Sequence, residues 1–494
     1  KIWSFLKLEK KPVYTSGSVR KTMLKTACGM VAGTLSMSGY NLADTYFVGQ
    51  LTGESPMAAM GFTFPVIMLV GCLFHGLGIG VMTTAAQALG ARKRFRAATL
   101  ITSGIWLVVA FSIFLAALGM AFSGWLFSRF GATGETLELV NGYMRIWFFG
   151  CATASLSMTG NDVLIAVGDS RMVSVLMFLG MLVNVALDPI LIFGFGWIPA
   201  MGIRGAALAT VIAQGVCALA VLLAVAKRHG LIRFRRMPWD EVRPAWNRIV
   251  RFAGPATLGM LMMPIGSVIL THITSEFGDA AVGGVAAAGR LEAVAFVFPM
   301  SLGMSLTPFI GQNYGAKLYG RIREGRRFAM RFALGFLLAA AVIYFFIADW
   351  VAAWFLAEPA LRPIMAECLR ITAWGFAGVE IHRFAGFTYT GCGRPSVAAW
   401  LNALRIMVFM VPFSLLALYF RSLTGLFVAR LAADVLAGGI GWFLASRMTW
   451  RLPADGEPHP VPVSKRELFR RLFPGRLRAL VFAQNDIDGR SSTQ

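Results

Sequence analysis

The segment Met181-Leu-Val-Asn-Val-Ala-Leu-Asp-Pro189 lies inside an apolar run that extends from about Met172 to Trp197. Asn184 and Asp188 are four residues apart, so they share one face if the run is a helix. Pro189 follows directly and frees a backbone carbonyl one turn earlier. A carboxylate in a segment long enough to cross a bilayer is unfavourable by roughly 2.5–3.5 kcal/mol on insertion scales. Such residues usually mark an ion or proton site rather than a tolerated polar contact in a helical bundle, and we interpret Asp188 as part of an ion or proton site.

Apolar runs of about 20 residues recur along the whole chain, as membrane helices require. Of the 494 residues, 57% are hydrophobic and 14% are charged, and the mean hydropathy is +0.66. This composition predicts an all-α polytopic membrane protein, because the short alternating segments of a membrane barrel are absent from the sequence. The net charge of +22 does not indicate nucleic-acid binding, because the basic residues fall between apolar runs. The six cysteines show neither metal-ligand spacing nor a disulfide framework, and we expect no cofactor.

Twelve membrane spans are predicted from the apolar runs. Their approximate limits are 23–47, 56–86, 97–121, 138–166, 172–196, 203–226, 249–275, 281–312, 328–348, 364–390, 396–419 and 422–446. Most of the 46 Lys and Arg residues lie in the tails and in alternate gaps between these spans. The opposite side has four, Arg129, Arg204, Arg362 and Arg421. This bias predicts a multi-pass protein of the cell (inner) membrane with both termini in the cytoplasm.

An internal repeat divides the chain into two halves. Gln87-Ala-Leu-Gly-Ala-Arg92 returns as Gln312-Asn-Tyr-Gly-Ala-Lys317, an offset of 225 residues. Each half has six spans, so both enter the membrane from the same side as parallel repeats. We therefore predict an N-terminal lobe (1–226), a basic linker (227–248), a C-terminal lobe (249–447) and a basic tail (448–494). Within the tail, Ser464–Ala483 is either a basic amphipathic helix on the inner leaflet or disordered.

The first lobe offers a second carboxylate, Asp44, for the site that Asp188 marks. Asn41 lies three residues before Asp44 and shares its helix face. A Na⁺ site needs about five or six oxygen ligands, which the side chains of Asp44, Asn184, Asp188 and Thr210 can help to supply. The same carboxylates, shielded from water, can carry protons instead, so the sequence leaves Na⁺ and H⁺ as alternatives.

The two lobes differ in how their intramembrane charges can be paired. The first lobe has acids without deeply placed arginines, together with soft side chains such as those of Met30, Tyr40 and Met177. An acidic cavity with pliable walls favours lipophilic cations, and we predict that Tyr40, Asn41 and Met177 line it. The second lobe holds both signs of charge, and we expect internal pairs such as Arg290 with Glu292 or Glu380 with Arg383 through neighbouring helices. The residues concerned are Arg290, Glu292, Glu380, Arg383, Arg405, Arg430 and Asp434.

Several stretches together resemble the multidrug and toxic compound extrusion (MATE) family. They are 41–50 (NLADTYFVGQ), 87–91 (QALGA), 184–193 (NVALDPILIF), 201–210 (MGIRGAALAT) and 308–316 (PFIGQNYGA). The resemblance implies a twelve-helix, two-lobe antiporter that alternates between inward-open and outward-open states. In the branch with an ion site in the N-terminal lobe, the coupling residues match Asp44, Asn184, Asp188 and Thr210. Tyr143 and Asn161 match nearby polar positions of the substrate cavity.

The expected function is cation-coupled export of amphipathic, cationic drugs or toxic compounds in exchange for H⁺ or Na⁺, by a monomer in the lipid bilayer. The alternative is a flippase or exporter of a lipid-linked or anionic substrate, which the arginines of the second lobe favour. An intramembrane enzyme is a third class, but the sequence contains no His-Glu-x-x-His, no Gly-x-Ser-x-Gly and no nucleotide-binding loop. We therefore predict a transporter rather than an enzyme.

Overall fold

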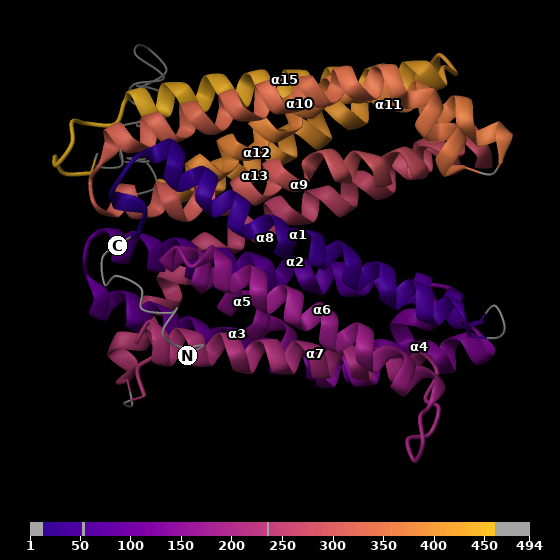
Figure 1. Ribbon diagram of the computed structural model, residues 1–494, viewed down its shortest axis with the longest axis horizontal. Coiled ribbons are helices and arrows are strands. Elements are labelled where there is room, and N and C mark those ends of the chain that lie inside the picture. The colour runs from indigo at the N-terminus through magenta and orange to yellow at the C-terminus, as the bar shows by residue number, and fades with distance from the viewer. Residues whose placement is uncertain (1–12, 52–54, 235–236, 357, 460–494) are drawn as a thin grey trace, which may run out of the picture.

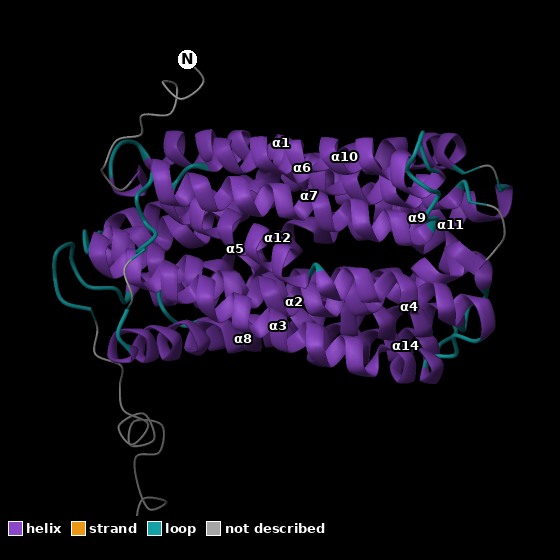
Figure 2. Ribbon diagram, turned by 90° about the horizontal axis from the view of Figure 1, so that it is seen from below, coloured by secondary structure: helices purple, strands orange, loops and turns teal. Residues whose placement is uncertain are grey.

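The structure is a computed structural model that describes residues 13–51, 55–234, 237–356 and 358–459. Within helices α1 and α2 it leaves out the side chains of Met37, Ser38, Tyr40, Asn41, Leu42, Thr45 and Met57. The described residues form long helices that run side by side along the longest axis of the molecule (Figures 1 and 2). An isolated bridge between Phe195 and Ile198 is the one extended pairing in this part of the chain.

The first lobe contains seven α-helices that make six membrane crossings. They are α1 (Val19–Gly49), α2 (Ser55–Gly90), α3 (Arg94–Arg129), α4 (Gly134–Phe149), α5 (Cys151–Val167), α6 (Ser170–Phe193) and α7 (Ile203–Leu223). A turn of π-helix, Ala224–Arg228, extends α7. Helices α4 and α5 form a single crossing that is interrupted at Gly150.

The second lobe repeats this arrangement. Its helices are α8 (Trp239–Ser275), α9 (Asp279–Gly315), α10 (Tyr319–Phe355), α11 (Arg362–Thr372), α12 (Phe376–Gly391), α13 (Pro395–Ala403), α14 (Val411–Tyr419) and α15 (Leu423–Trp450). The pairs α11–α12 and α13–α14 each form one crossing, joined by the 3-10 turn Ala373–Gly375 and the π-helix Leu404–Met410. Figure 1 shows α9 to α13 and α15 in the upper half of the molecule and α3 to α7 in the lower half.

The predicted all-α fold with twelve crossings in two lobes is confirmed. Nine of the described helical segments are long and apolar enough to span a membrane by themselves. The three remaining crossings are α1, which is rich in polar residues, and the interrupted pairs α4–α5 and α11–α12. Helix α8 begins at Trp239, so it extends into the segment predicted as a linker. The lobe and linker limits stay predictions, and Ser464–Ala483 lies outside the described residues.

The duplication is visible in the backbone as well as in the sequence. Arg92 and Lys317, 225 residues apart, both adopt positive φ angles, of 57° and 59°, in the turns that end α2 and α9. Gly168 and Gly393 form the second such pair, with φ angles of 94° and 83°. Left-handed residues of this kind commonly end helices because they redirect the chain without losing the last hydrogen bonds. The two halves therefore stop and turn their helices at equivalent positions.

The lobes touch most closely where α2 of the first lobe crosses α9 of the second. A Cβ atom on Gly90 would lie 1.8 Å from the carbonyl oxygen of Gln312, and one on Gly315 would lie 2.0 Å from that of Gln87. Gln87 donates its side-chain amide to the carbonyl of Gly391 at 3.0 Å. Gln312 donates in the same way to the carbonyl of Ala166 at 2.7 Å. These reciprocal contacts join the lobes at the end of the bundle that carries the basic turns after α2 and α9, which we call the basic end.

Candidate functional site

The predicted site is centred on α6, where Asn184 and Asp188 are both fully buried. The Asn184 amide donates a hydrogen bond to the Asp188 carboxylate at 3.3 Å, as expected for residues one helical turn apart. Pro189 lies within the same helix and has no N–H group. The carbonyl of Val185 therefore lacks its usual helical donor and offers one more oxygen at this level.

Asp44 joins this pair from α1, which packs along α6. Close approach of the two helices is possible because Gly29 and Gly33 face Ser170 and Ser174: a Cβ atom on either glycine would lie 2.9–3.0 Å from a serine hydroxyl. The buried Asp44 carboxylate lies within electrostatic range of the Asp188 carboxylate and the Asn184 amide. Two acids from different helices thus share one buried site, which sequence spacing alone does not require.

Tyr143 and Thr210 add polar groups from two further helices. Tyr143 of α4 is buried within electrostatic range of both carboxylates. Thr210 of α7 is also buried. Its level follows from the antiparallel packing of α7 on α6, where Gly205 meets Leu191 and Cys217 meets Gly180. This register places Thr210 opposite the segment of α6 that contains Asn184 and Asp188.

Four oxygens of these side chains accept no hydrogen bond from any described residue. They are Asp44 Oδ1, Asn184 Oδ1, Asp188 Oδ2 and Thr210 Oγ1. Buried acceptors without donors are unfavourable unless a proton or a cation satisfies them. The donor set of carboxylate, amide and hydroxyl oxygens suits Na⁺, and protonation of one carboxylate suits H⁺. Among the described residues, no three His, Cys, Asp or Glu side chains are grouped so that they could hold a metal ion together.

The other residues that were predicted to line the substrate cavity lie in three different situations. The Met177 sulfur packs against α1, 3.1 Å from where a Cβ atom on Gly33 would lie, so it forms part of the helix contact beside the site. Asn161 lies half-buried on α5, and no described contact joins it to the two carboxylates. The side chains of Tyr40 and Asn41 lie outside the described residues.

Asp162, next to Asn161, is a third buried acid of the first lobe that sequence analysis left without a role. It packs so closely on α2 that a Cβ atom on Gly78 would lie 2.0 Å from Asp162 Oδ2. His75, one turn earlier on α2, lies within electrostatic range of it. Asp162 therefore belongs to the α2–α5 contact rather than to the Asp44–Asp188 site.

The second lobe has no copy of this site. At the offset of 225 residues, the four predicted coupling residues are replaced by apolar ones: Ile269, Phe409, Phe413 and Val435. The rings of Phe409 and Phe413 pack with centroids 6.0 Å apart. At these equivalent positions, all within the described residues, the second lobe therefore carries apolar side chains where the first lobe has acidic and polar oxygens.

Carboxylates of the second lobe are instead paired with arginines. Glu380 accepts from Arg383 at 3.0 Å, which confirms that expected pair, although both residues lie on α12 rather than on neighbouring helices. The expected pairing of Arg290 with Glu292 is wrong. Glu292 is buried and binds Arg430 of α15, whereas Arg290, two positions away on α9, points to an exposed face.

Two further contacts involve the buried acids of the second lobe. Asp434 binds Arg405 at 2.6 Å. The Thr372 hydroxyl donates to Glu292 at 3.0 Å. Each buried acid of this lobe, Glu292, Glu380 and Asp434, is therefore paired with an arginine, as the mixed signs of its sequence predicted.

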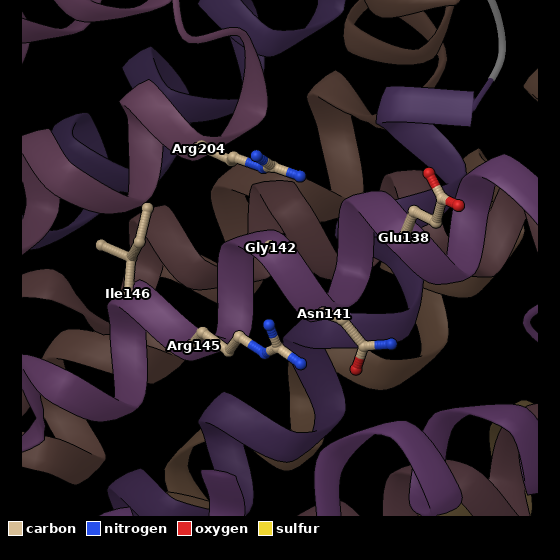
Figure 3. A pocket seen from close by; sticks show the side chains of 6 residues that line it. All are labelled: Glu138, Asn141, Gly142, Arg145, Ile146 and Arg204. Atoms are coloured by element: carbon tan, nitrogen blue, oxygen red, sulfur yellow. The ribbon is translucent and has the colours of Figure 1, made fainter.

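A cavity of about 450 Å³ at the end of the bundle opposite the basic end is separate from the site (Figure 3). It lies between α4 and α7 and is lined by Glu138, Asn141, Gly142, Arg145, Ile146 and Arg204. Figure 3 shows Arg145 and Arg204 on either side of Gly142. None of the predicted site residues lines this cavity.

A short segment before α1 contacts both lobes at the basic end, and sequence analysis did not identify it. Tyr14, in the 3-10 turn Val13–Thr15, is fully buried between the lobes. Its hydroxyl donates to the carbonyl of Ile165 in the first lobe at 3.2 Å. Its backbone N–H donates to Gln312 at 3.1 Å, and its carbonyl accepts from Asn313 and Arg321 of the second lobe. The one sequence signal for a polar contact at the basic end was the internal repeat, in which Gln87 returns as Gln312.

Fold and site together define a two-lobe, α-helical membrane transporter, and comparison with known proteins gives the family. The MatE family model matches residues 30–190 and 255–416. The chain belongs to the MATE family, whose members are transporters and not enzymes.

Three similar proteins cover nearly the whole chain. The FAD transporter of Shewanella oneidensis is 29% identical over 434 residues, which are 88% of this chain and 96% of the relative. The multidrug export protein MepA of Staphylococcus aureus is 24% identical over 453 residues, 90% of this chain and 96% of the relative. The crystal structure of the Vibrio cholerae MATE transporter VcmN in the bent form has a TM-score of 0.82 at 30% identity, and the match covers 88% of this chain and 97% of that one.

Proposed function

We propose that this protein is a secondary active antiporter that exports amphipathic, cationic drugs or toxic compounds in exchange for H⁺ or Na⁺. The observation that carries the proposal is the Asp44–Asp188 cluster, in which two buried carboxylates lie together without a basic partner among the described residues. Such a cluster is stable only when a cation or proton compensates its charge. The coupling ion is the one bound group that the proposal requires, and no cofactor takes part.

Alternating access follows from the way the lobes meet. We place the basic end in the cytoplasm because of the positive-inside rule, with the protein in the cell membrane as a monomer. The close contacts between α2 and α9 and the Tyr14 segment hold the lobes together at that end. The tight glycine contacts between these two helices, at Gly90, Gly311 and Gly315, all lie in their last turns, at that end. We therefore assign this conformation to the outward-facing half of the cycle.

Exchange arises if the ion and the substrate compete for the same carboxylates. A lipophilic cation bound near Asp44 and Asp188 supplies the positive charge that the ion supplies in its absence. The half-buried Met158 and Met177 give the surrounding helices adaptable apolar contacts. Ion binding from outside then releases the substrate, and coupling follows from the different affinities of the two conformations for each ligand. The relative named as a multidrug export protein supports this substrate class.

The test is transport by purified protein in sealed vesicles, with pH and Na⁺ gradients imposed separately. Asp44→Asn and Asp188→Asn should insert normally but reduce gradient-driven accumulation of a fluorescent lipophilic cation to the level of empty vesicles. Asp279→Asn, at an exposed position at the start of α9, is the matched control and should transport like the wild type. Full gradient-driven transport by Asp188→Asn would show that coupling occurs elsewhere.

An anionic substrate is the second candidate, because one relative is named as a FAD transporter. The second lobe holds the arginines that such a substrate needs, although Arg383, Arg405 and Arg430 are already bound to carboxylates. Arg290 is exposed and forms no ion pair within the described ranges. Vesicles that transport FAD but no lipophilic cation, and lose FAD transport in Arg290→Gln, would favour this alternative over the cationic one.

A further inference from the structure

A second cavity, of about 610 Å³, lies at the basic end between the start of α1 and the first turns of α10. Its charged lining is Arg20 from α1 with Glu324, Arg327 and Arg331 from α10. Three arginines and one glutamate give the cavity a net charge of about +2. This cavity shares no lining residue with the Asp44–Asp188 site.

The arginines of this cavity differ from those inside the second lobe. Arg20, Arg327 and Arg331 are exposed, and none of them forms an ion pair with a described carboxylate. Arg327 and Arg331 are one helical turn apart, so their guanidinium groups lie on one face of α10. Guanidinium groups converging from two helices suit a phosphate group, whose oxygens accept paired N–H donors.

Aromatic rings continue the cavity along α10 away from its charged end. Phe328 and Phe332 line the cavity, and Phe336 follows one turn later. The ring centroids are 6.2 Å apart for the first pair and 5.4 Å apart for the second. After Arg331 the helix has no charged residue until Asp349. The cavity therefore sits where α10 changes from a charged to an apolar surface, which is the boundary between lipid headgroups and hydrocarbon.

We propose that this cavity binds one anionic phospholipid of the inner leaflet. The arginines hold the phosphate of the headgroup, and one acyl chain lies along the Phe328–Phe332–Phe336 column. A zwitterionic headgroup fits less well, because its choline or ethanolamine cation would lie among three guanidinium groups. The orientation of this leaflet rests on the proposed cytoplasmic placement of the basic end, but the binding chemistry does not depend on what the protein transports.

The experiment is native mass spectrometry of the full chain in detergent, titrated with phosphatidylglycerol, phosphatidylcholine or inorganic phosphate. The wild type should retain one phosphatidylglycerol at concentrations where phosphatidylcholine dissociates. Arg327→Gln and Arg331→Gln should each weaken retention by roughly fivefold, the fold-change equivalent to about 1 kcal/mol. Arg243→Gln, an equal loss of charge at an exposed position at the start of α8, is the control and should retain the lipid.

Three results would overturn the proposal. Equal retention of phosphatidylcholine would remove the selectivity for anions. Equal weakening by Arg243→Gln would show that general positive charge, not this cavity, holds the lipid. Displacement of phosphatidylglycerol by millimolar inorganic phosphate, or equal retention of a short-chain phosphatidylglycerol, would assign the cavity to a free anion without the acyl contact. Transport assays are not involved, so failure here leaves the proposed antiport untouched.

Discussion

Replacing Tyr14 by alanine should open the basic end of the transporter. The side chain is fully buried at the junction of the lobes. Its hydroxyl donates to Ile165 of the first lobe, and its ring packs edge-on against Phe309 of the second lobe with the centroids 6.0 Å apart. Because the contacts reach both lobes, they exist only while the lobes are closed at this end. The substitution should therefore shift the conformational equilibrium rather than unfold either lobe.

The size of the shift can be worked from these contacts. Removing a fully buried aromatic side chain costs about 3–5 kcal/mol, which corresponds to a change of roughly 10² to 10³ or more in the ratio of closed to open forms. Tyr14→Phe removes only the hydroxyl that donates to Ile165, so its effect should be about 1 kcal/mol, or roughly fivefold. Burial raises the pKa of the Tyr14 phenol well above its usual value. The hydroxyl therefore stays protonated, and the closure should not change with pH below about 10.

The assay is a distance measurement between spin labels at Lys93 and Glu324, two exposed positions at the basic end in different lobes. The wild type should give one short distance population, Tyr14→Ala should give a dominant longer one, and Tyr14→Phe should lie between them. The two variants and the wild type should elute identically in size-exclusion chromatography. An unchanged distance distribution in a folded Tyr14→Ala protein would refute the assignment of this segment as a closure between the lobes.

Three further predictions concern the ion site, the second lobe and the orientation. Thr210→Val keeps the side-chain shape but removes an oxygen. If Na⁺ is the coupling ion, the substitution should weaken Na⁺-driven export roughly tenfold and change proton-driven export little. Vesicle transport that is unchanged under both gradients would make Thr210 a packing residue. Arg430→Met should lower the free energy of unfolding by about 3–5 kcal/mol, measured by denaturant titration, because it leaves the Glu292 charge buried without a partner. The double variant with Glu292→Leu should recover most of the lost stability. An equal loss in the double variant would contradict the role of the buried charge. In a background without native cysteines, a cysteine at Asp279 should react with an impermeant maleimide on intact cells and one at Lys93 only after permeabilisation, and the reverse pattern would invert the orientation.

The sequence determined the class of protein, the twelve crossings and the duplication, because these depend on local properties. In a bilayer every backbone polar group must be satisfied within its own helix, so each apolar run of sufficient length specifies a crossing by itself. The positive φ angles of Arg92 and Lys317 show that the repeat reaches into the turns. Partners for Asp188 were also predicted from sequence: Asn184 through helical spacing, and Asp44 and Thr210 as oxygen donors that also match the MATE motifs.

Only the tertiary structure decided which distant groups meet. Glu292 lies two residues from Arg290 in the chain but binds Arg430, because side chains two positions apart point to different faces of a helix. Tyr14, an ordinary residue in the sequence, becomes one of the contacts that join the two lobes. The arginines at the starts of α1 and α10 form one cavity only because these helices lie side by side. Such pairings depend on how the helices are arranged around each other. The hydrophobicity of the lipid-facing surfaces does not specify this arrangement, whereas packing between the helices does.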